Sequence, residues 1–249
     1  MTLLKDTSFI CLDTETTGLD PEKDRIVEIA ACRFTLAEIV DSFDSLVQPQ
    51  MAISEESLRI HQITPEMVKD SPTFDLIAKE FLEFVGDSII VGHGIAFDIS
   101  LIIHEARRYN VLCSLKKNRL FDTLRLARFY GDSPNNSLKN LAHHFNVEQM
   151  QAHRAMHDVK MNIEVFKHLV ARQKTVEDVI KILARPIKIK YMPLGKYKGR
   201  LFSEVPVHYL KWASNMKFDE DLLYSIRLEL KKRKSGNHFS QASNPFQNL

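Results

Sequence analysis

Long apolar runs are absent from this sequence of 249 residues. No stretch approaches the roughly 18 uninterrupted apolar residues that a membrane-spanning helix needs. The first six residues, Met1 to Asp6, lack the apolar core of a secretory signal. We therefore expect a cytoplasmic protein with no membrane segment.

Cysteine is also scarce. The three cysteines, Cys11, Cys32 and Cys113, are odd in number, far apart and set in apolar or loop contexts. Such a set favours neither a disulfide framework nor a zinc site with closely spaced ligands. We interpret them as reduced structural thiols.

The composition excludes disordered and fibrous proteins. Hydrophobic residues make up 44% and charged residues 27% of the chain, an ordinary balance for a globular protein. Internal repeats are lacking. The length allows one sizeable domain together with a small second one.

Charge is unevenly distributed, although the net charge is only +2. Residues 185–234 contain thirteen Lys or Arg against five Asp or Glu, a net charge of +8, whereas residues 1–184 carry −6. Because Lys and Arg neutralise phosphates, a basic module joined to an acidic domain fits a nucleic-acid partner. A merely solvated basic surface is the alternative.

The periodicity of apolar residues predicts strands early in the chain and helices later. Strands are predicted at 8–12, 25–34, 38–47 and 88–91. Helices are predicted at 73–85, from about 96, at 122–130, at 137–145 with Ser137 as N-cap, and at 155–171. This order indicates an α/β domain, in which a three-stranded meander continues into strands that alternate with helices. The expected result is a mixed sheet flanked by helices.

A domain boundary is predicted at Arg185-Pro186, because proline disfavours helix in the residue before it. The segment beyond it reads as a strand at 187–191, a basic turn at 195–200 and two short helices at 206–214 and 219–234. These elements form a small basic α+β module. The predicted organisation is an α/β domain at 1–175, a linker helix at 176–186, the basic module at 187–234 and a disordered polar tail at 235–249.

Two carboxylates occur where the first predicted strand ends. Asp13 and Glu15 are two residues apart, so in an extended chain both side chains point to the same side. Neighbouring carboxylates repel each other unless a cation lies between them. The pair alone also fits two solvated acids at the edge of a sheet.

Three further candidates come from later segments. Asp98 lies in the first turn of its predicted helix, and Asp158 lies in an early turn with His153 five residues before it. Each has an ordinary explanation, since acids in a first turn complement the helix dipole. Together with Asp13 and Glu15 they supply hard oxygen ligands, which suit Mg²⁺ or Mn²⁺, and an imidazole that can accept a proton. Two such ions can hold a phosphodiester and activate a water molecule.

Three segments resemble, in order, the exonuclease motifs of the DEDD superfamily of 3′–5′ exonucleases. They are Asp13-Thr14-Glu15-Thr16-Thr17-Gly18-Leu19, Gly92-His93-Gly94-Ile95-Ala96-Phe97-Asp98 and His153-Arg154-Ala155-Met156-His157-Asp158. The spacing in the third marks the histidine-containing branch, similar to the exodeoxyribonuclease X and polymerase III epsilon groups. His61-Gln62-Ile63-Thr64 resembles a short segment often placed between the first two motifs.

The resemblance implies a ribonuclease H-like fold and removal of mononucleotides from 3′ ends with two metal ions in each active site. It also implies roles for individual residues. The metal ligands would be Asp13, Glu15, Asp98 and Asp158, and the general base would be His153. His157, four residues after His153, could instead form a zinc site with it, but the carboxylates in motif positions favour the general base.

Substrate contacts are implied in the same way. The candidate substrate-binding residues are Thr16, Thr17, Gly18, Leu19, His93 and Phe97. The backbone of 16–19 would hold the terminal nucleotide with Leu19 against its base, while core packing is an alternative of nearly equal weight for Phe97. Gly94 stands where the family usually has Asn, and we expect altered substrate contacts there rather than lost activity.

The basic module resembles a small module attached to some bacterial exonucleases. Lysines interleaved with aromatic residues could pair phosphate contacts with base stacking on single strands. The candidate contacts are Lys196, Tyr197, Lys198 and Arg200. We assign Trp212 to the core of the module. The tail segment 241–246 weakly resembles a sliding-clamp ligand, with Asn244 where such peptides have an aliphatic residue.

We therefore predict an exonuclease that acts on single-stranded DNA or duplex 3′ ends in repair or end trimming. Three alternatives stay open. They are an RNA-directed exonuclease of the oligoribonuclease or ribonuclease T type, a proofreading subunit of a polymerase, and a nucleic-acid-binding protein without catalysis.

Overall fold

The computed structural model describes residues 1–130, 135–148 and 154–241, the last six by their backbone alone. The chain forms two compact units. The first contains residues 1–126 and 137–182, and the second contains residues 127–136 and 183–249. Each unit has its own hydrophobic core.

The first unit is built on one mixed sheet of five strands in the order β3-β2-β1-β4-β5. The strands are β1 (Phe9–Thr16), β2 (Ile26–Phe34), β3 (Ile39–Leu46), β4 (Ile89–Gly92) and β5 (Leu120–Asp122). β1, β2 and β3 form the predicted antiparallel meander, and β4 and β5 add in parallel beyond β1. The predicted sheet is therefore confirmed, with β5 as a short strand that the periodicity missed.

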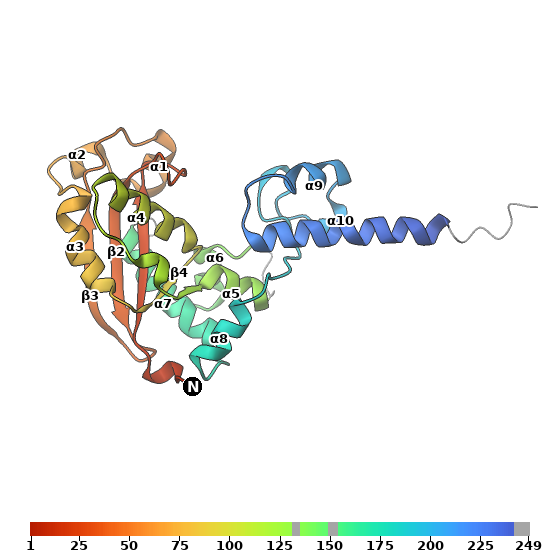
Figure 1. Cartoon of the computed structure of the whole chain (residues 1–249), viewed down its shortest axis with the longest axis horizontal. Helices are drawn as coiled ribbons and strands as arrows, with labels where there is room; N and C mark the ends of the chain where they lie inside the picture. The colour runs from red at the N-terminus through yellow and green to blue at the C-terminus, as the bar shows by residue number, and fades with distance from the viewer. Residues whose placement is uncertain (131–134, 149–153, 242–249) are drawn as a thin grey trace, which may run out of the picture. The chain divides into compact units, whose positions relative to one another are not determined.

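The central strands are buried on both faces. Along β1, Ile10 and Leu12 pack into one core cluster with α3 (Phe74–Val85) and α4 (Ala96–Arg108). Because side chains alternate along a strand, Phe9 points the other way, where it packs against Phe166 of α7 (Ala155–Val170) with ring centroids 5.4 Å apart. Helices thus cover both faces of the sheet (Figure 1).

Most predicted helices are confirmed. Besides α3, α4 and α7, they include α5 (Thr123–Tyr130) and α6 (Leu138–His144), where Ser137 caps the helix by accepting the backbone N–H of Asn140. α8 (Val176–Leu183) is the helix predicted at 176–186. Two short helices before α3 were not predicted, α1 (Glu55–His61) and α2 (Pro65–Val68).

The second unit contains α9 (Val207–Ala213), α10 (Glu220–Gln241) and the short 3₁₀ turns Gly195–Tyr197 and Phe202–Glu204. The strand predicted at 187–191 is wrong, since only an isolated bridge joins Tyr191 to Leu201. Its backbone donors are bonded elsewhere: the N–H of Ile187 donates to Asp221 and that of Ile189 to Ser225. The alternating pattern of the segment therefore reflects docking on α10 rather than pairing in a sheet.

Trp212 also corrects an expectation. The buried core of the second unit is made of Met192, Phe202, Val205, Leu210, Ala213, Leu222 and Ile226. Trp212 instead leaves 49% of its surface exposed, so its assignment to the core is wrong. Its position in the last turn of α9 directs it away from the buried side of that helix, which carries Leu210 and Ala213.

The predicted domain boundaries stay predictions, with two differences to record. The last turn of α5 clusters with the second unit, because Arg128 is ion-paired there with Asp219 and Asp221. α10 continues to Gln241, beyond the predicted end of the module at residue 234. Among the described residues, none of the helices combines the length and apolarity needed to cross a membrane.

Candidate active site

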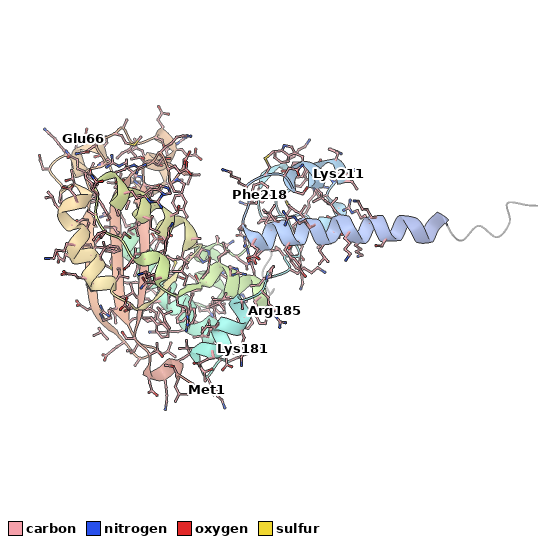
Figure 2. The ribbon with its side chains drawn as sticks, viewed as in Figure 1. Met1, Glu66, Lys181, Arg185, Lys211 and Phe218 are labelled. Atoms are coloured by element: carbon pink, nitrogen blue, oxygen red, sulfur yellow. The ribbon has the colours of Figure 1, made fainter. Side chains whose placement is uncertain are left out.

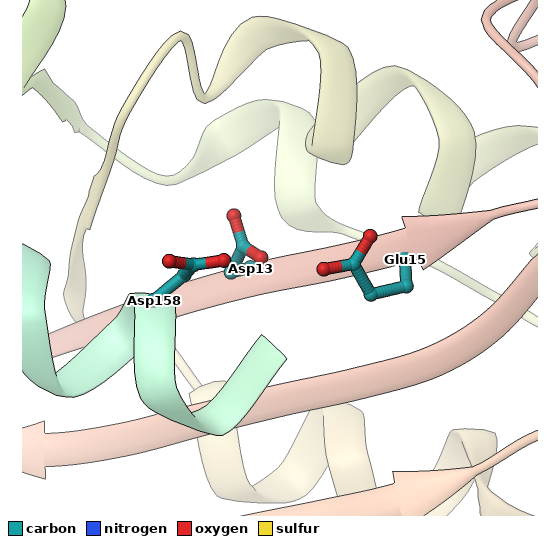
Figure 3. A group of neighbouring side chains, drawn as sticks. All are labelled: Asp13, Glu15 and Asp158. Atoms are coloured by element: carbon teal, nitrogen blue, oxygen red, sulfur yellow. The ribbon is translucent and has the colours of Figure 1, made fainter. Parts of the chain in front are cut away.

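Three carboxylates meet where β1 passes the first turns of α7. Asp13 and Glu15 alternate to the face of the sheet that α7 covers, as the strand period requires. Asp158 lies in the first turn of α7. Each of the three residues offers a carboxylate oxygen, and these atoms lie within 4.8 Å of one another (Figure 3). The structure thus brings together residues that are 145 positions apart in the sequence.

The acidic cluster is electrostatically costly without a cation. Burial, followed by the charges of Asp98 and Glu15, raises the pKa of Asp13 well above its usual value. Burial, with the charges of Asp158 and Glu28, raises the pKa of Glu15 to about 8. Partly buried carboxylates that repel one another gain from a divalent cation between them.

Asp98 is not among the three residues whose oxygens lie within 4.8 Å of one another, but it is near enough for its charge to raise the pKa of Asp13. Its Oδ1 accepts the backbone N–H of Thr14 at 3.1 Å and the hydroxyl of Thr14 at 2.6 Å. These bonds fix the first turn of α4 to β1, and they oppose the effect of burial, which raises the pKa of Asp98 to about 7. Of the five predicted catalytic residues, the structure therefore brings Asp13, Glu15, Asp98 and Asp158 into one region. His153 lies outside the described residues.

The start of α7 is held by a buried glutamate that the sequence analysis missed. Glu28 on β2 is 1% exposed and lies opposite Glu15 in the β1–β2 pairing. Its Oε2 accepts the backbone N–H of Ala155 at 2.8 Å, and its Oε1 accepts Nε and Nη2 of Arg154 at 2.9 and 2.5 Å. The carboxylate thus occupies the N-terminus of the helix that carries Asp158. The sequence does contain a signal for this role, because Glu28 is the single acid within the apolar run of β2.

The loop after β1 is organised by Asp24. Its Oδ1 accepts the hydroxyl of Thr17 at 2.9 Å, and its Oδ2 accepts the backbone N–H of Asp20 at 2.8 Å. A Cβ on Gly18 would lie 2.5 Å from Oδ2 of Asp24, so a larger residue would push this carboxylate away from its hydrogen bonds in the loop. Leu19 leaves 78% of its surface exposed, as a side chain that contacts a substrate would.

His61 supports the same loop from α1. Its Nδ1 accepts the backbone N–H of Ile63 at 2.9 Å, so its Nε2 carries the proton. Nε2 then donates to the carbonyl oxygen of Thr16 at 3.2 Å. The side chain is 2% exposed, which makes it a structural link between the loop and the segment 61–64.

A second network ties this loop to α4. Glu105 is buried, and its Oε1 accepts Nε of Arg25 at 2.6 Å and Nη1 of Arg108 at 3.3 Å. Arg108 also donates to the carbonyl oxygens of Glu22 and Asp24, at 2.5 and 2.9 Å. The loop after the first motif is therefore clamped to the helix that begins with the second motif.

His93 and Gly94 form the turn between β4 and α4. Nδ1 of His93 lies 3.0 Å from the hydroxyl of Thr123, which in turn lies 2.7 Å from Oδ1 of Asn162 on α7. Gly94 has a φ of +74°, and its N–H donates to Asp122 at 3.0 Å. Glycine and asparagine are the residues that most readily adopt this left-handed conformation, which explains why glycine can stand in the family's asparagine position.

Phe97 is partly buried and packs against the core cluster, as the core-packing alternative predicts. Its contact with a substrate stays a prediction. Thr16 and Thr17 are buried, and the hydroxyl of Thr16 donates to the carbonyl oxygen of Gly18 at 2.5 Å.

His157 is half-buried and forms interactions of its own.

The donor set of this site suits a hard divalent cation. Carboxylate oxygens are the preferred ligands of Mg²⁺ and Mn²⁺, and sulfur ligands are absent from the cluster of Asp13, Glu15 and Asp158. Cys11 is buried nearby, but its Sγ lies 3.6 Å from the carbonyl oxygen of Val159 and from Nδ2 of Asn162. Burial raises the pKa of this thiol well above its usual value, which fits the prediction of a reduced structural cysteine.

Curated relatives include DNA polymerases III of the PolC type. DNA polymerase III PolC-type of Caldanaerobacter subterraneus subsp. tengcongensis is 34% identical over 193 residues, which cover 75% of this chain and 14% of the polymerase. The corresponding polymerase of Clostridium perfringens is 34% identical over 198 residues, or 76% of this chain and 13% of the polymerase. The chain thus matches a small part of each relative.

Solved structures share the fold. Exonuclease X in complex with 5′ overhanging duplex DNA superposes with a TM-score of 0.57 at 24% identity, over 70% of this chain and 98% of that one. Escherichia coli exonuclease I in complex with a dA16 oligonucleotide gives a TM-score of 0.63 at 21% identity, over 72% and 43% of the two chains. The expected ribonuclease H-like fold is confirmed.

Two family models match the chain in separate places. Residues 180–227 match a family described as a proposed quorum-sensing-regulated virulence factor, which covers most of the basic module. Residues 10–166, more than half of the chain, match the family described as exonuclease. This second match contains all three motifs, and it shows that the protein belongs to the exonuclease family, whose DEDD 3′–5′ members its motifs resemble.

Proposed function

We propose that the protein removes nucleotides from the 3′ ends of DNA by a two-metal mechanism with His153 as the general base. The observation that carries this proposal is the convergence of Asp13, Glu15 and Asp158, whose carboxylate oxygens lie within 4.8 Å of one another. Asp98, fixed to Thr14, adds a fourth carboxylate from α4.

The four carboxylates would hold two ions, Mg²⁺ or Mn²⁺, which supply a polarised water and neutralise the charge on the phosphodiester. The protein's own groups do the positioning. Asp13 and Glu15 are fixed by β1, and Asp158 is fixed by α7, whose start is bonded to Glu28. We assign acceptance of the proton of the attacking water to His153, because histidine is the residue whose pKa lies nearest to working pH.

The terminal nucleotide would be held by the loop after β1. The backbone of Thr16, Thr17 and Gly18 would approach it, and the exposed side chain of Leu19 would contact its base. His93 and Phe97 would line the neighbouring pocket. Asp24 and Glu105 brace this loop by accepting hydrogen bonds from Thr17 and Arg25, while Leu19 stays exposed.

DNA is the proposed substrate because the similar proteins are exonucleases bound to DNA or DNA polymerases. Exonuclease X is bound there to a duplex with a 5′ overhang, exonuclease I is bound to a single strand, and the curated relatives are DNA polymerases. The similarity to polymerase III also makes a proofreading role a second candidate, for which a polymerase would be the partner. We propose that the strand is also contacted by four residues of the basic module, Lys196, Tyr197, Lys198 and Arg200. We further propose that the protein acts in the cytoplasm.

A paired degradation assay tests this function. Matched DNA and RNA strands, each labelled at either the 5′ or the 3′ end, are incubated with the protein and Mg²⁺ or Mn²⁺. We expect early release of labelled mononucleotide from 3′-labelled DNA, and no release with EDTA or with the Asp13→Ala variant. A strong preference for RNA would contradict the proposal that DNA is the substrate. Full turnover by Asp13→Ala would contradict the proposal that the carboxylate cluster is the active site. Asp87→Ala, an exposed acid of the same unit, is the matched control.

A further inference from the structure

We propose that the second unit binds single-stranded nucleic acid by stacking a base on Trp212, with the lysines beside it contacting phosphates. The choice of ligand rests on the proposed function, but the site is separate from the carboxylate cluster. Trp212 has no part in the proposed function.

The first observation is the exposure of Trp212. The largest apolar side chain of the unit leaves 49% of its surface in water, while its helix neighbours Leu210 and Ala213 are buried. Single exposed hydrophobic residues are common and need no explanation. Trp212, however, does not stand alone.

A row of three aromatic rings supports it. The rings of Tyr209 and Trp212 lie 5.1 Å apart, and those of Tyr197 and Tyr209 lie 4.8 Å apart in an edge-on contact. Tyr197 and Tyr209 are partly buried and pack against the core of the unit. They therefore form a rigid base that holds the indole of Trp212 at the surface, as a stacking platform requires.

Lysines lie beside this row of rings, one of them in the turn Gly195–Tyr197. Gly195 has a φ of +71°, and a side chain at this position would collide with the hydroxyl of Tyr209, so glycine lets the turn lie against the row. Nζ of Lys196 then lies 5.8 Å from the ring centroid of Tyr197. Lys211, next to Trp212, is exposed on α9 (Figure 2).

The acids of the unit leave these cations largely uncompensated. Asp219 and Asp221 are ion-paired with Arg128, and Glu229 is ion-paired with Arg233. Ion pairs thus engage three of the five acids described between residues 187 and 234, and the remaining two are Glu204 and Glu220. The net charge of 185–234 is +8. A positive surface with an exposed indole matches a phosphate backbone that carries unpaired bases.

Trp212 is the only tryptophan of the chain, so its fluorescence reports on this site alone. The full-length protein is titrated in EDTA, which prevents hydrolysis, with a 15-nucleotide dT strand and separately with the matching rU strand. We expect saturable quenching of the emission, because a stacked base quenches indole fluorescence. The two strands show whether the site distinguishes DNA from RNA. Unchanged emission at saturating concentrations of both strands would overturn the proposal.

Two variants test whether stacking contributes to binding. Binding of a fluorescein-labelled dT strand is measured by anisotropy in EDTA. Trp212→Ala should weaken binding at least roughly fivefold, the lower end of the effect of losing one stacked base. Tyr224→Ala, which removes an aromatic ring that is 40% exposed on α10, is the matched control and should leave affinity within twofold. Equal effects of the two changes would refute the stacking role. Thermal unfolding checks that both variants fold, and quenching in the wild type remains decisive if one does not.

The test is independent of catalysis. In Asp13→Ala, hydrolysis should be lost while quenching of Trp212 by the dT strand is retained. If wild-type protein hydrolyses DNA without quenching, this site is refuted and the proposed function stands. If quenching occurs without hydrolysis of any strand, the proposed function fails and this site stands.

Discussion

At the scale of single residues, the site combines a cluster of repelling carboxylates with a set of supports that hold it in place. Asp13, Glu15 and Asp158 lie close together although burial and mutual charge raise the pKa values of the first two. Such an arrangement reduces the stability of the metal-free protein, and it is tolerated where function requires it. The supports are Glu28 and Asp98, whose bonds were not visible in the sequence.

The raised pKa of Glu15 predicts how stability depends on pH. Its pKa is about 8 in the folded protein and about 4.5 in the unfolded chain, so between these values the folded state retains a proton that unfolding releases. The free energy of unfolding of the metal-free protein should therefore fall as pH rises from 5 to 8, by roughly 1–3 kcal/mol. Urea denaturation in EDTA measures this slope.

The variant Glu15→Gln isolates the contribution of this group. Its stability should change less over the same pH range, because the titrating carboxyl is removed. Addition of Mg²⁺ should raise the stability of the wild type most at pH 8, where the carboxylate is available as a ligand. If wild type and variant lose stability equally between pH 5 and 8, the raised pKa of Glu15 is not the cause of the pH dependence.

Glu28 should act as a positioning residue for α7. Glu28→Gln keeps the shape of the side chain but removes the charge that holds Arg154 and the N–H of Ala155. We expect kcat to fall about tenfold while KM changes little, because Asp158 lies in the first turn of α7, whose start Glu28 holds. Steady-state hydrolysis of a 3′-labelled strand measures both constants.

The partner residue and a surface acid provide the controls. Arg154→Met should give a similar loss, and the double variant should lose little more, since both changes break one pair. Glu83→Gln breaks an exposed ion pair with Lys79 and should leave both constants unchanged. Additive effects of the two changes at Glu28 and Arg154 would show that the pair does not act as a unit.

At the scale of elements, the site depends on where each strand and helix begins or ends. β1 delivers its two acids to one face and Thr14 to the other, so the same strand serves both α7 and α4. The turn between β4 and α4 requires a left-handed residue at Gly94. This requirement is conformational, because the nearest atom to a Cβ there would be Leu124 at 3.9 Å.

Substitutions at Gly94 should therefore follow backbone preference rather than size. Gly94→Asn should retain most of the stability and activity, whereas Gly94→Val should lower the free energy of unfolding by about 1–2 kcal/mol. Urea denaturation compares the two variants. A Gly94→Asn protein as unstable as Gly94→Val would show that space, not φ, limits this position.

At the scale of the whole molecule, two units with separate cores are joined in one chain. The second unit includes the last turn of α5, because the side chain of Arg128 is buried between Asp219 and Asp221. Asp221 is itself 1% exposed and also accepts the backbone N–H of Ile187. The module is therefore completed by a residue from within the exonuclease domain sequence, which makes simple truncation at Ala184 a poor way to isolate it.

Arg128→Met should destabilise the second unit selectively. Loss of the guanidinium leaves the buried charge of Asp221 with fewer partners, at a cost of about 3 kcal/mol. Hydrogen exchange should accelerate at backbone amides of α9 and α10 and change little in β1 and β2. The substitution Arg172→Met, at an exposed arginine of the first unit, is the control. Equal acceleration in both units would indicate one cooperative fold.

Much of the fold could be predicted because it depends on local patterns. Apolar runs located β1 to β4, and helical periodicity located α3, α4 and α7. The pattern failed at 187–191, where alternation reflects docking on α10, and at Trp212, whose hydrophobic character was taken for burial. In both cases the sequence shows the preference of a residue and only the tertiary structure shows its neighbours.

The sequence by itself determined which residues can do the chemistry. The spacing of Asp13 and Glu15 places both on one face of a strand, since the period of a strand is two. Tertiary structure alone decided that Asp158 meets them, that Thr14 holds Asp98, and that Glu28 holds the start of α7. These contacts join segments up to 145 residues apart, and pairing across such distances is set by the packing of the sheet and its helices rather than by any local preference.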